Sequence, residues 1–142
     1  MKSNPIFDAL ILLILGAIPT AALELTITVK GIRSDKGKIA ALAFIDHDGF
    51  PGQVAKAKAH AAVDAKLGTV NLTLKNLPAG KIAVTVLHDE NGNGKLDRDV
   101  FGIPLEGVGM SGKPPGNMPP TFNDVVFDLS KSQKLEITLK YR

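Results

Sequence analysis

Residues 82–97 read IAVTVLHDENGNGKLD, an apolar run that passes directly into alternating Asp, Asn and Gly. The apolar part, residues 82–87, is rich in β-branched side chains, which favour a strand and are unusual in the first helix of an EF-hand. The polar part combines hydrogen-bonding side chains with two glycines, which is the composition of a sharp turn. We therefore predict a β-strand that ends in a tight, oxygen-rich loop.

The loop after this strand has the spacing of a calcium-binding loop. Calcium takes about six to eight oxygen ligands, and a short chain supplies them when alternate residues turn inward around a bend. The predicted ligands are four side chains and one backbone carbonyl: the side chains of Asp89, Asn91, Asn93 and Asp97, and the carbonyl of Lys95. The alternative is a hydrogen-bonded turn without an ion, in which the two Asp carboxylates accept hydrogen bonds from backbone N–H groups.

One ligand of the calcium loop is missing. The bidentate Glu that closes an EF-hand loop is replaced here by Val100. We therefore expect weak binding, with a dissociation constant of roughly 0.1 to 1 mM. Four other acidic residues are candidates for the missing carboxylate: Asp46, Asp48, Asp99 and Glu106. The first two follow an apolar strand, as Asp89 does, and would reach the loop if the two strands run in the same direction.

The first 22 residues have the pattern of a secretory signal peptide. Lys2 precedes ten uninterrupted apolar or Gly residues, 9–18, and the small residues Thr20 and Ala22 match the positions that a signal peptidase reads. Such a run is too short to cross a bilayer, which needs about twenty helical residues. Cleavage after Ala22 would export residues 23–142 to the periplasm or the cell exterior, whereas the alternative is a retained N-terminal anchor.

The composition limits the class of protein. The chain has no Cys, which excludes a disulfide scaffold, a thiolate metal site and a lipid-modified cysteine. Its formal net charge is +3, but the lysines are dispersed without an Arg cluster or an aromatic stacking platform, so nucleic-acid binding is not expected. We expect no membrane span after signal cleavage, and residues 23–142 have the length of a single domain.

Short strands separated by turns account for most of the mature sequence. Period-2 alternation or continuous apolar character predicts strands at residues 23–32, 38–46, 70–74, 81–87 and 135–139. The first two strands are expected to form one hairpin, and the strands at 70–74 and 81–87 a second.

The intervening segments predict loops and little helix. Residues 50–55 suggest a short helix or turn, followed by an edge strand with solvated lysines. Residues 107–120 are rich in Gly and Pro and predict a long loop, after which a helical turn begins near Thr121. The predicted fold is all-β, a single β-sandwich of about six to eight strands with at most one or two helical turns.

Residues 88–97, together with 101–107 and 120–122, resemble a bacterial secreted family called domain of unknown function 2141. Residues 49–51 and 77–84 are similar to it as well, so the likeness extends over nearly the whole mature chain. The resemblance implies a small exported β-sandwich of the transthyretin-like kind, with the Asp/Asn/Gly loop as its signature, and it carries no biochemical role. The loop also resembles, more weakly, the calcium-binding B repeats of Gram-positive surface adhesins, which have a Glu at the position of Val100.

Two classes of function follow from these residues. The first is a non-enzymatic module that binds calcium for stability, or to shape a surface that meets another envelope or extracellular component. The second is a small secreted enzyme or zinc-dependent protein that uses His47, His88 and Asp89, because each histidine stands beside an Asp at a strand end. Ser111 lies in a Gly-Met-Ser-Gly stretch that superficially resembles part of a nucleophile elbow, but the prolines that follow forbid the helix which that motif requires.

Overall fold

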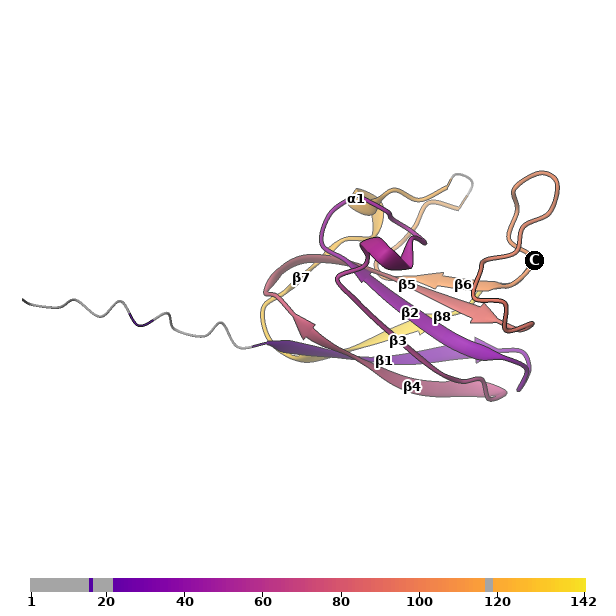
Figure 1. Ribbon diagram of the computed structural model, residues 1–142, viewed down its shortest axis with the longest axis horizontal. Coiled ribbons are helices and arrows are strands. Elements are labelled where there is room, and N and C mark those ends of the chain that lie inside the picture. The colour runs from indigo at the N-terminus through magenta and orange to yellow at the C-terminus, as the bar shows by residue number, and fades with distance from the viewer. Residues whose placement is uncertain (1–15, 17–21, 117–118) are drawn as a thin grey trace, which may run out of the picture.

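The computed structural model describes Gly16 and residues 22–116 and 119–142. Within these ranges eight strands form two sheets that pack face to face, which confirms the predicted β-sandwich (Figure 1). Except for Gly16 and Ala22, the expected signal peptide lies outside the described residues. The helices found in these same ranges are all too short or too polar to cross a membrane.

The first sheet has three strands in the order β4-β1-β8. Their bounds are Gly68–Leu77 for β4, Leu23–Ile32 for β1 and Gln133–Thr138 for β8. Strand β1 is antiparallel to β4 and parallel to β8. Because successive side chains of a strand point to opposite faces, the alternate residues Leu25, Ile27 and Val29 are all fully buried.

The second sheet has the order β3-β2-β5-β6, and the short strand β7 also pairs with β5. The bounds are Ala59–Asp64 for β3, Lys38–Phe44 for β2, Gly80–Asp89 for β5, Gly107–Met110 for β6 and Phe127–Leu129 for β7. The core between the sheets includes these buried side chains: Leu25, Ile27, Leu72, Leu74 and Ile137 from the first sheet, and Ile39, Ala41, Val84 and Val86 from the second.

Irregular segments cover the outer face of the second sheet. They contain the two helical elements of the described ranges, η1 (Val54–Lys56) and α1 (Phe122–Val125), which Figure 1 shows above the sheet. The Phe50 ring packs edge-on against Phe44 at 5.6 Å and against Phe122 at 6.1 Å between ring centroids. Strand β5 is buried on both faces from Ile82 to Val86, and this explains why these residues are apolar apart from Thr85.

Both predicted hairpins are wrong. Strands β1 and β2 lie in different sheets, as do β4 and β5. The link from β4 to β5 is Pro78-Ala79. A two-residue hairpin of type I′ needs positive φ at both central positions, and the proline ring fixes φ near −65°. Alternation within each strand predicts which face is buried, but it does not say which strand becomes the neighbour.

The segment 107–120 is not loop throughout, contrary to the prediction. Its first four residues, Gly107–Met110, form β6 at the edge of the second sheet. They contain no proline, so their N–H groups can join the ladder. Glycine is required at the first of them, because a Cβ on Gly107 would lie 2.4 Å from the Tyr141 ring.

Candidate functional site

The loop from Asp89 to Asp97 follows β5 directly, at the right-hand end of the sandwich in Figure 1. Asp89 pairs with Lys38, the first residue of β2, so the turn before β2 lies beside the loop. Gly37 in that turn has a φ of +68°, and a Cβ there would lie 1.9 Å from the carbonyl oxygen of Asp89. The turn therefore packs closely against the start of the loop.

The side chain of Asp89 organises the first bend of the loop. Its Oδ1 accepts a hydrogen bond from the N–H of Asn93 at 3.2 Å, and its Oδ2 accepts one from the N–H of Gly94 at 2.8 Å. The N–H of Asn93 also donates to Oδ1 of Asn91, at 3.2 Å. Asp89 is buried, and these bonds fix its carboxylate on the inner side of the bend.

The two asparagines hold the carboxylate of Asp97 over the same bend. The amide of Asn91 donates to Asp97 Oδ2 at 2.6 Å. The amide of Asn93 donates to both carboxylate oxygens, at 2.9 Å and 3.0 Å. The N–H of Lys95 donates to Asn93 Oδ1 at 3.0 Å. All four predicted side-chain ligands are thus joined in one hydrogen-bonded network.

Glu106 is the candidate carboxylate that reaches this network. It is only 6% exposed, and it accepts hydrogen bonds at 3.2 Å from the N–H of Glu90 and the N–H of Asp97. Burial raises the pKa of Glu106 above its ordinary value of 4.5, and the negative charges of Asp97 and Asp89 raise it further, against the backbone hydrogen bonds that lower it. The negative charges of Asp89 and Asp97 therefore act on the buried carboxyl group of Glu106.

The other candidates lie elsewhere. Strand β2 is antiparallel to β5, and Phe44 at its end pairs with Ala83 near the start of β5, so Asp46 and Asp48 lie at the opposite end from Asp89. These two residues could reach the loop only if β2 and β5 ran in the same direction, and the two strands are antiparallel. Asp48 forms an ion pair with Lys56 instead, at 3.0 Å.

Asp99 organises the next loop along the chain. Its Oδ1 accepts hydrogen bonds from the N–H groups of Phe101 and Ile103, both at 2.9 Å, and its Oδ2 pairs with Arg142. The hydrogen bond from Ile103 is the main reason why the pKa of Asp99 lies below its ordinary value. Val100, at the closing position of an EF-hand loop, is an apolar residue that is 93% exposed.

Sequence reasoning missed the residues that anchor the loop to the β1–β2 turn. Arg33 in that turn donates from Nε to Glu90 Oε1 at 2.9 Å, and Ser34 donates to Glu90 Oε2 at 3.0 Å. The Arg33 guanidinium also stacks 4.4 Å above the centroid of the Tyr141 ring. The hydrogen bond from Arg33 is the largest cause of the lowered pKa of Glu90. These residues are far apart in sequence, and no local motif marks them.

His88 is a buried structural residue in this arrangement. Its Nε2 lies 2.7 Å from the carbonyl oxygen of Lys36, and its Nδ1 lies 2.7 Å from the hydroxyl of Tyr141. Because a carbonyl can only accept, Nε2 carries the proton, and the Tyr141 hydroxyl donates to Nδ1. His47 is exposed beyond the far end of β2, so the structure does not bring the two histidines together.

Ser111 is likewise enclosed by backbone groups. It is 1% exposed, and its hydroxyl accepts a hydrogen bond from the N–H of Val84 at 2.9 Å and donates one to the carbonyl of Val125 at 2.7 Å. The serine therefore joins β5 to the end of α1.

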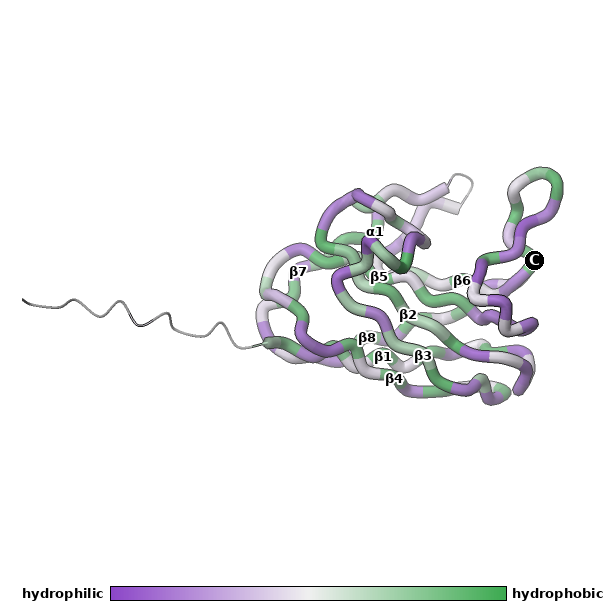
Figure 2. Tube along the Cα trace, viewed as in Figure 1, coloured by the Kyte–Doolittle hydropathy of each residue, from purple (hydrophilic) through white to green (hydrophobic). Residues whose placement is uncertain are grey.

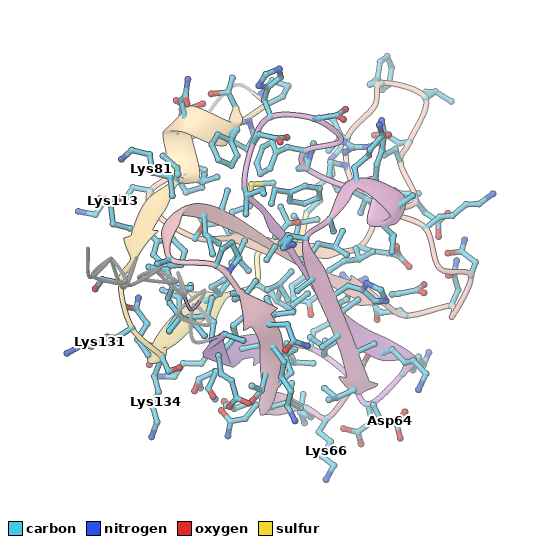
Figure 3. The ribbon with its side chains drawn as sticks, turned by 60° about the vertical axis from the view of Figure 1, so that its left-hand side comes forward. Asp64, Lys66, Lys81, Lys113, Lys131 and Lys134 are labelled. Carbon is cyan, nitrogen blue, oxygen red and sulfur yellow. The ribbon has the colours of Figure 1, made fainter. Side chains whose placement is uncertain are left out.

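Four lysines lie far from the candidate loop. Figure 3 shows Lys81, Lys113, Lys131 and Lys134 extending into solvent from one side of the molecule. Lys81 stands near the start of β5, whereas Asp89 ends that strand, and it pairs with Asp128 at 3.4 Å. These basic side chains therefore form a solvated surface at the other end of the sandwich.

The donor set of the loop is mixed. Over residues 22–116 and 119–142, no three His, Cys, Asp or Glu side chains are grouped as metal ligands. An ion at the loop would therefore depend on amide and main-chain oxygens in addition to carboxylates. Calcium accepts such oxygens, whereas zinc favours His and Cys.

Comparison with known proteins gives one match. The family model described as uncharacterized protein conserved in bacteria (DUF2141) matches residues 27–138. Searches of the curated proteins and of the solved structures found no significant match. The matched range runs from β1 to β8 and includes the whole candidate loop.

Proposed function

The chain belongs to the DUF2141 family of uncharacterized bacterial proteins, and we propose that it is an exported, non-enzymatic β-sandwich module whose loop from Asp89 to Asp97 binds calcium weakly. The N-terminal pattern of residues 1–22 supports export. The arrangement of oxygen atoms around the loop supports calcium binding. Because the loop follows β5 and is held by Arg33 and Ser34 of the β1–β2 turn, a bound ion would also stabilise the fold.

The observation that carries the proposal is the approach of Glu106 to the loop. The carboxylates of Asp89 and Asp97 and the amides of Asn91 and Asn93 lie around one bend, and the carboxylate of Glu106 accepts the backbone N–H groups of Glu90 and Asp97. We assign to Glu106 the part of the closing carboxylate that Val100 cannot supply. With the backbone carbonyl of Lys95, this set approaches the ligand number that calcium requires.

Electrostatics support a cation at this place. The charges of Asp89 and Asp97 raise the pKa of Glu106, so the ionised state of the buried carboxylate is disfavoured without a counter-charge. Among residues 22–116 and 119–142, the side chain of Asp97 forms no ion pair and accepts hydrogen bonds from the neutral amides of Asn91 and Asn93. A divalent cation would offset the mutual repulsion of the three carboxylates and take over the role of these donors.

The test is thermal unfolding in calcium and in a chelator. If the dissociation constant is about 0.1 mM, about 1 mM calcium stabilises the folded state by roughly 1.4 kcal/mol. For a domain of this size we expect the Tm to rise by about 3 to 6 °C. Asp89→Ala and Asp97→Ala should each abolish the rise.

A magnesium titration at the same concentrations provides the control for ionic strength, because magnesium demands a stricter octahedral geometry and keeps its water. The proposal is wrong if the Tm of the parent protein stays the same up to about 10 mM calcium, which exceeds the weak-site range.

A further inference from the structure

The chain exposes an apolar loop directly after the candidate calcium loop. Four large apolar side chains of the segment 98–105 face solvent: Val100, Phe101, Ile103 and Leu105. Val100 and Phe101 are 93% and 83% exposed. Figure 2 shows the hydrophobic tip of this loop standing away from the sandwich. Exposed apolar groups gathered in this way mark interaction sites more often than isolated ones do.

The loop is held in one shape although its side chains are exposed. Arg98 and Pro104 form an isolated β-bridge, and Arg98 donates from its guanidinium to the carbonyl of Gly102 at 2.8 Å. Asp99 accepts the N–H groups of Phe101 and Ile103 and pairs with Arg142. The apolar side chains are therefore presented by an ordered turn, which lowers the entropic cost of inserting them into a partner.

Charged groups surround the apolar tip. The tip, the adjacent calcium loop and the side chains that pair with them carry five carboxylates and four cations: Asp89, Glu90, Asp97, Asp99 and Glu106, and Arg33, Lys95, Arg98 and Arg142. Within residues 22–116 and 119–142, Lys95 and Arg98 form no ion pair with a carboxylate. A bound calcium ion would change the local excess of one negative charge to an excess of one positive charge.

We propose that the loop 98–105 docks the protein on an anionic phospholipid bilayer by inserting Val100, Phe101, Ile103 and Leu105 among the headgroups, and that calcium in the adjacent loop strengthens this binding. The calcium dependence rests on the proposed function. Calcium complements the anionic surface by reversing the local charge, and the cations Lys95 and Arg98 then lie beside the headgroups.

A lipid surface fits these features better than a folded partner does. A stable protein interface buries about 800 Å² on each side, which needs about 20 to 30 residues. The tip offers four apolar side chains on a turn that stands apart from the sandwich. The boundary between headgroups and acyl chains accepts apolar groups to a depth of about 5 to 10 Å and imposes no complementary shape.

The experiment is co-sedimentation of the purified protein with vesicles. The vesicles contain phosphatidylcholine alone or an equimolar mixture of phosphatidylcholine and phosphatidylglycerol, in about 1 mM calcium or in chelator. We expect binding to the anionic vesicles in calcium and weaker binding in chelator. The double variant Val100→Ser/Phe101→Ser should reduce the binding by about tenfold or more. Ile45→Ser, at the end of β2 away from Asp89, is the matched control and should bind as the parent does.

Val100 and Phe101 are almost fully exposed, so their double variant should fold, and an unchanged Tm in chelator verifies this. Leu105→Ser, at a half-exposed position, provides a second, independent tip variant. Absence of vesicle binding by a protein that still shows the calcium rise in Tm overturns the docking proposal alone. Equal binding in calcium and chelator overturns the calcium dependence. Binding that survives the tip substitutions, or a tip-dependent dimer in sedimentation velocity without vesicle binding, also overturns the proposal.

Discussion

Gly37 packs against the carbonyl group of Asp89, with the position of its absent Cβ only 1.9 Å from that oxygen. The contact places the β1–β2 turn against the strand end from which the candidate loop starts. The same turn supplies Arg33 and Ser34 to Glu90. The loop is thus attached to the sandwich at its first two residues, and a change in the turn should affect loop and fold together.

Gly37→Ala should destabilise the fold and impair the loop. The new methyl group collides with a backbone atom, and φ at this position is +68°, so a cost of about 1–3 kcal/mol is expected from strain alone. Gly92→Ala is the matched control, because Gly92 has a φ of +69° and a Cβ there meets nothing within 4 Å. Urea unfolding of both variants measures the difference, and equal losses would show that the contact with Asp89 contributes nothing.

Glu106→Gln should remove most of the calcium effect. The variant keeps the volume of the side chain but loses the charge that we assign to the closing ligand. We expect the rise in Tm to fall from about 3 to 6 °C to below about 1 °C. Asp46→Asn removes an equal charge at the opposite end of β2 and should leave the rise unchanged. A full calcium response in Glu106→Gln would exclude Glu106 as a ligand.

The stability of the calcium-free protein should fall as the pH rises above the ordinary pKa of Glu106, because the pKa of this buried carboxyl is raised in the folded state. Its pKa is raised in the folded state, so the protonated carboxyl contributes stability that is complete below the ordinary value of 4.5 and is lost as the pH rises through the raised pKa. Calcium should reverse this trend, because the ion binds the ionised form. Urea unfolding of the parent and of Glu106→Gln across this range tests it, and identical profiles would contradict the assignment.

Glu90 and Asp99 have the opposite effect on the stability of the protein, and they have it at lower pH. Their pKa values are lowered in the folded state, chiefly by the hydrogen bonds from Arg33 and from the backbone of Ile103 respectively. Each contributes stability that is present above its ordinary pKa and is lost as the pH falls through its lowered pKa. Glu90→Gln should flatten the acid side of the stability profile, whereas Asp128→Asn, at an exposed pair, should leave it almost unchanged.

The sequence predicts those parts of the fold that depend on neighbouring residues. The strand at residues 82–87 and the turn at its end are confirmed, because alternation and turn composition act over a few residues. The edge strand β3 is also present, but it begins at Ala59, so the lysines expected on it, Lys56 and Lys58, precede it. Strand pairing depends on contacts across the whole chain, and for this reason the two expected hairpins are wrong. The parallel pairing of β1 with β8 joins the two ends of the domain and leaves no local signal.

The candidate site, like the fold, could be predicted from the sequence only where it depends on neighbouring residues. The regular spacing of Asp89, Asn91, Asn93 and Asp97 is sufficient to bring these side chains together. Choosing Glu106 from among the acidic candidates requires the direction of β2, because an antiparallel β2 moves Asp46 to the other end. The anchoring of Glu90 by Arg33 could be found only in three dimensions.

Ser111→Ala should destabilise the protein without changing its calcium response. Ser111 continues the pairing of β6 with β5, since its N–H donates to the carbonyl of Val84 at 2.9 Å. Its hydroxyl then takes the place of a ladder carbonyl by accepting the N–H of Val84, and it donates to Val125. Alanine would leave the N–H of Val84 and the carbonyl of Val125 without the hydroxyl group as a hydrogen-bond partner. Because both groups lie in a buried place, the expected cost is about 1–3 kcal/mol.

Ser130→Ala is the control for this substitution, because Ser130 is exposed. Thermal unfolding should show a loss of about 3 to 10 °C for Ser111→Ala and almost none for the control. The calcium rise in Tm should be the same in both variants, since Ser111 has no contact with the loop network. A parent-like Tm in Ser111→Ala would mean that water or a rearranged backbone satisfies Val84, and a lost calcium response would mean that the loop is coupled to β6 through the sheet.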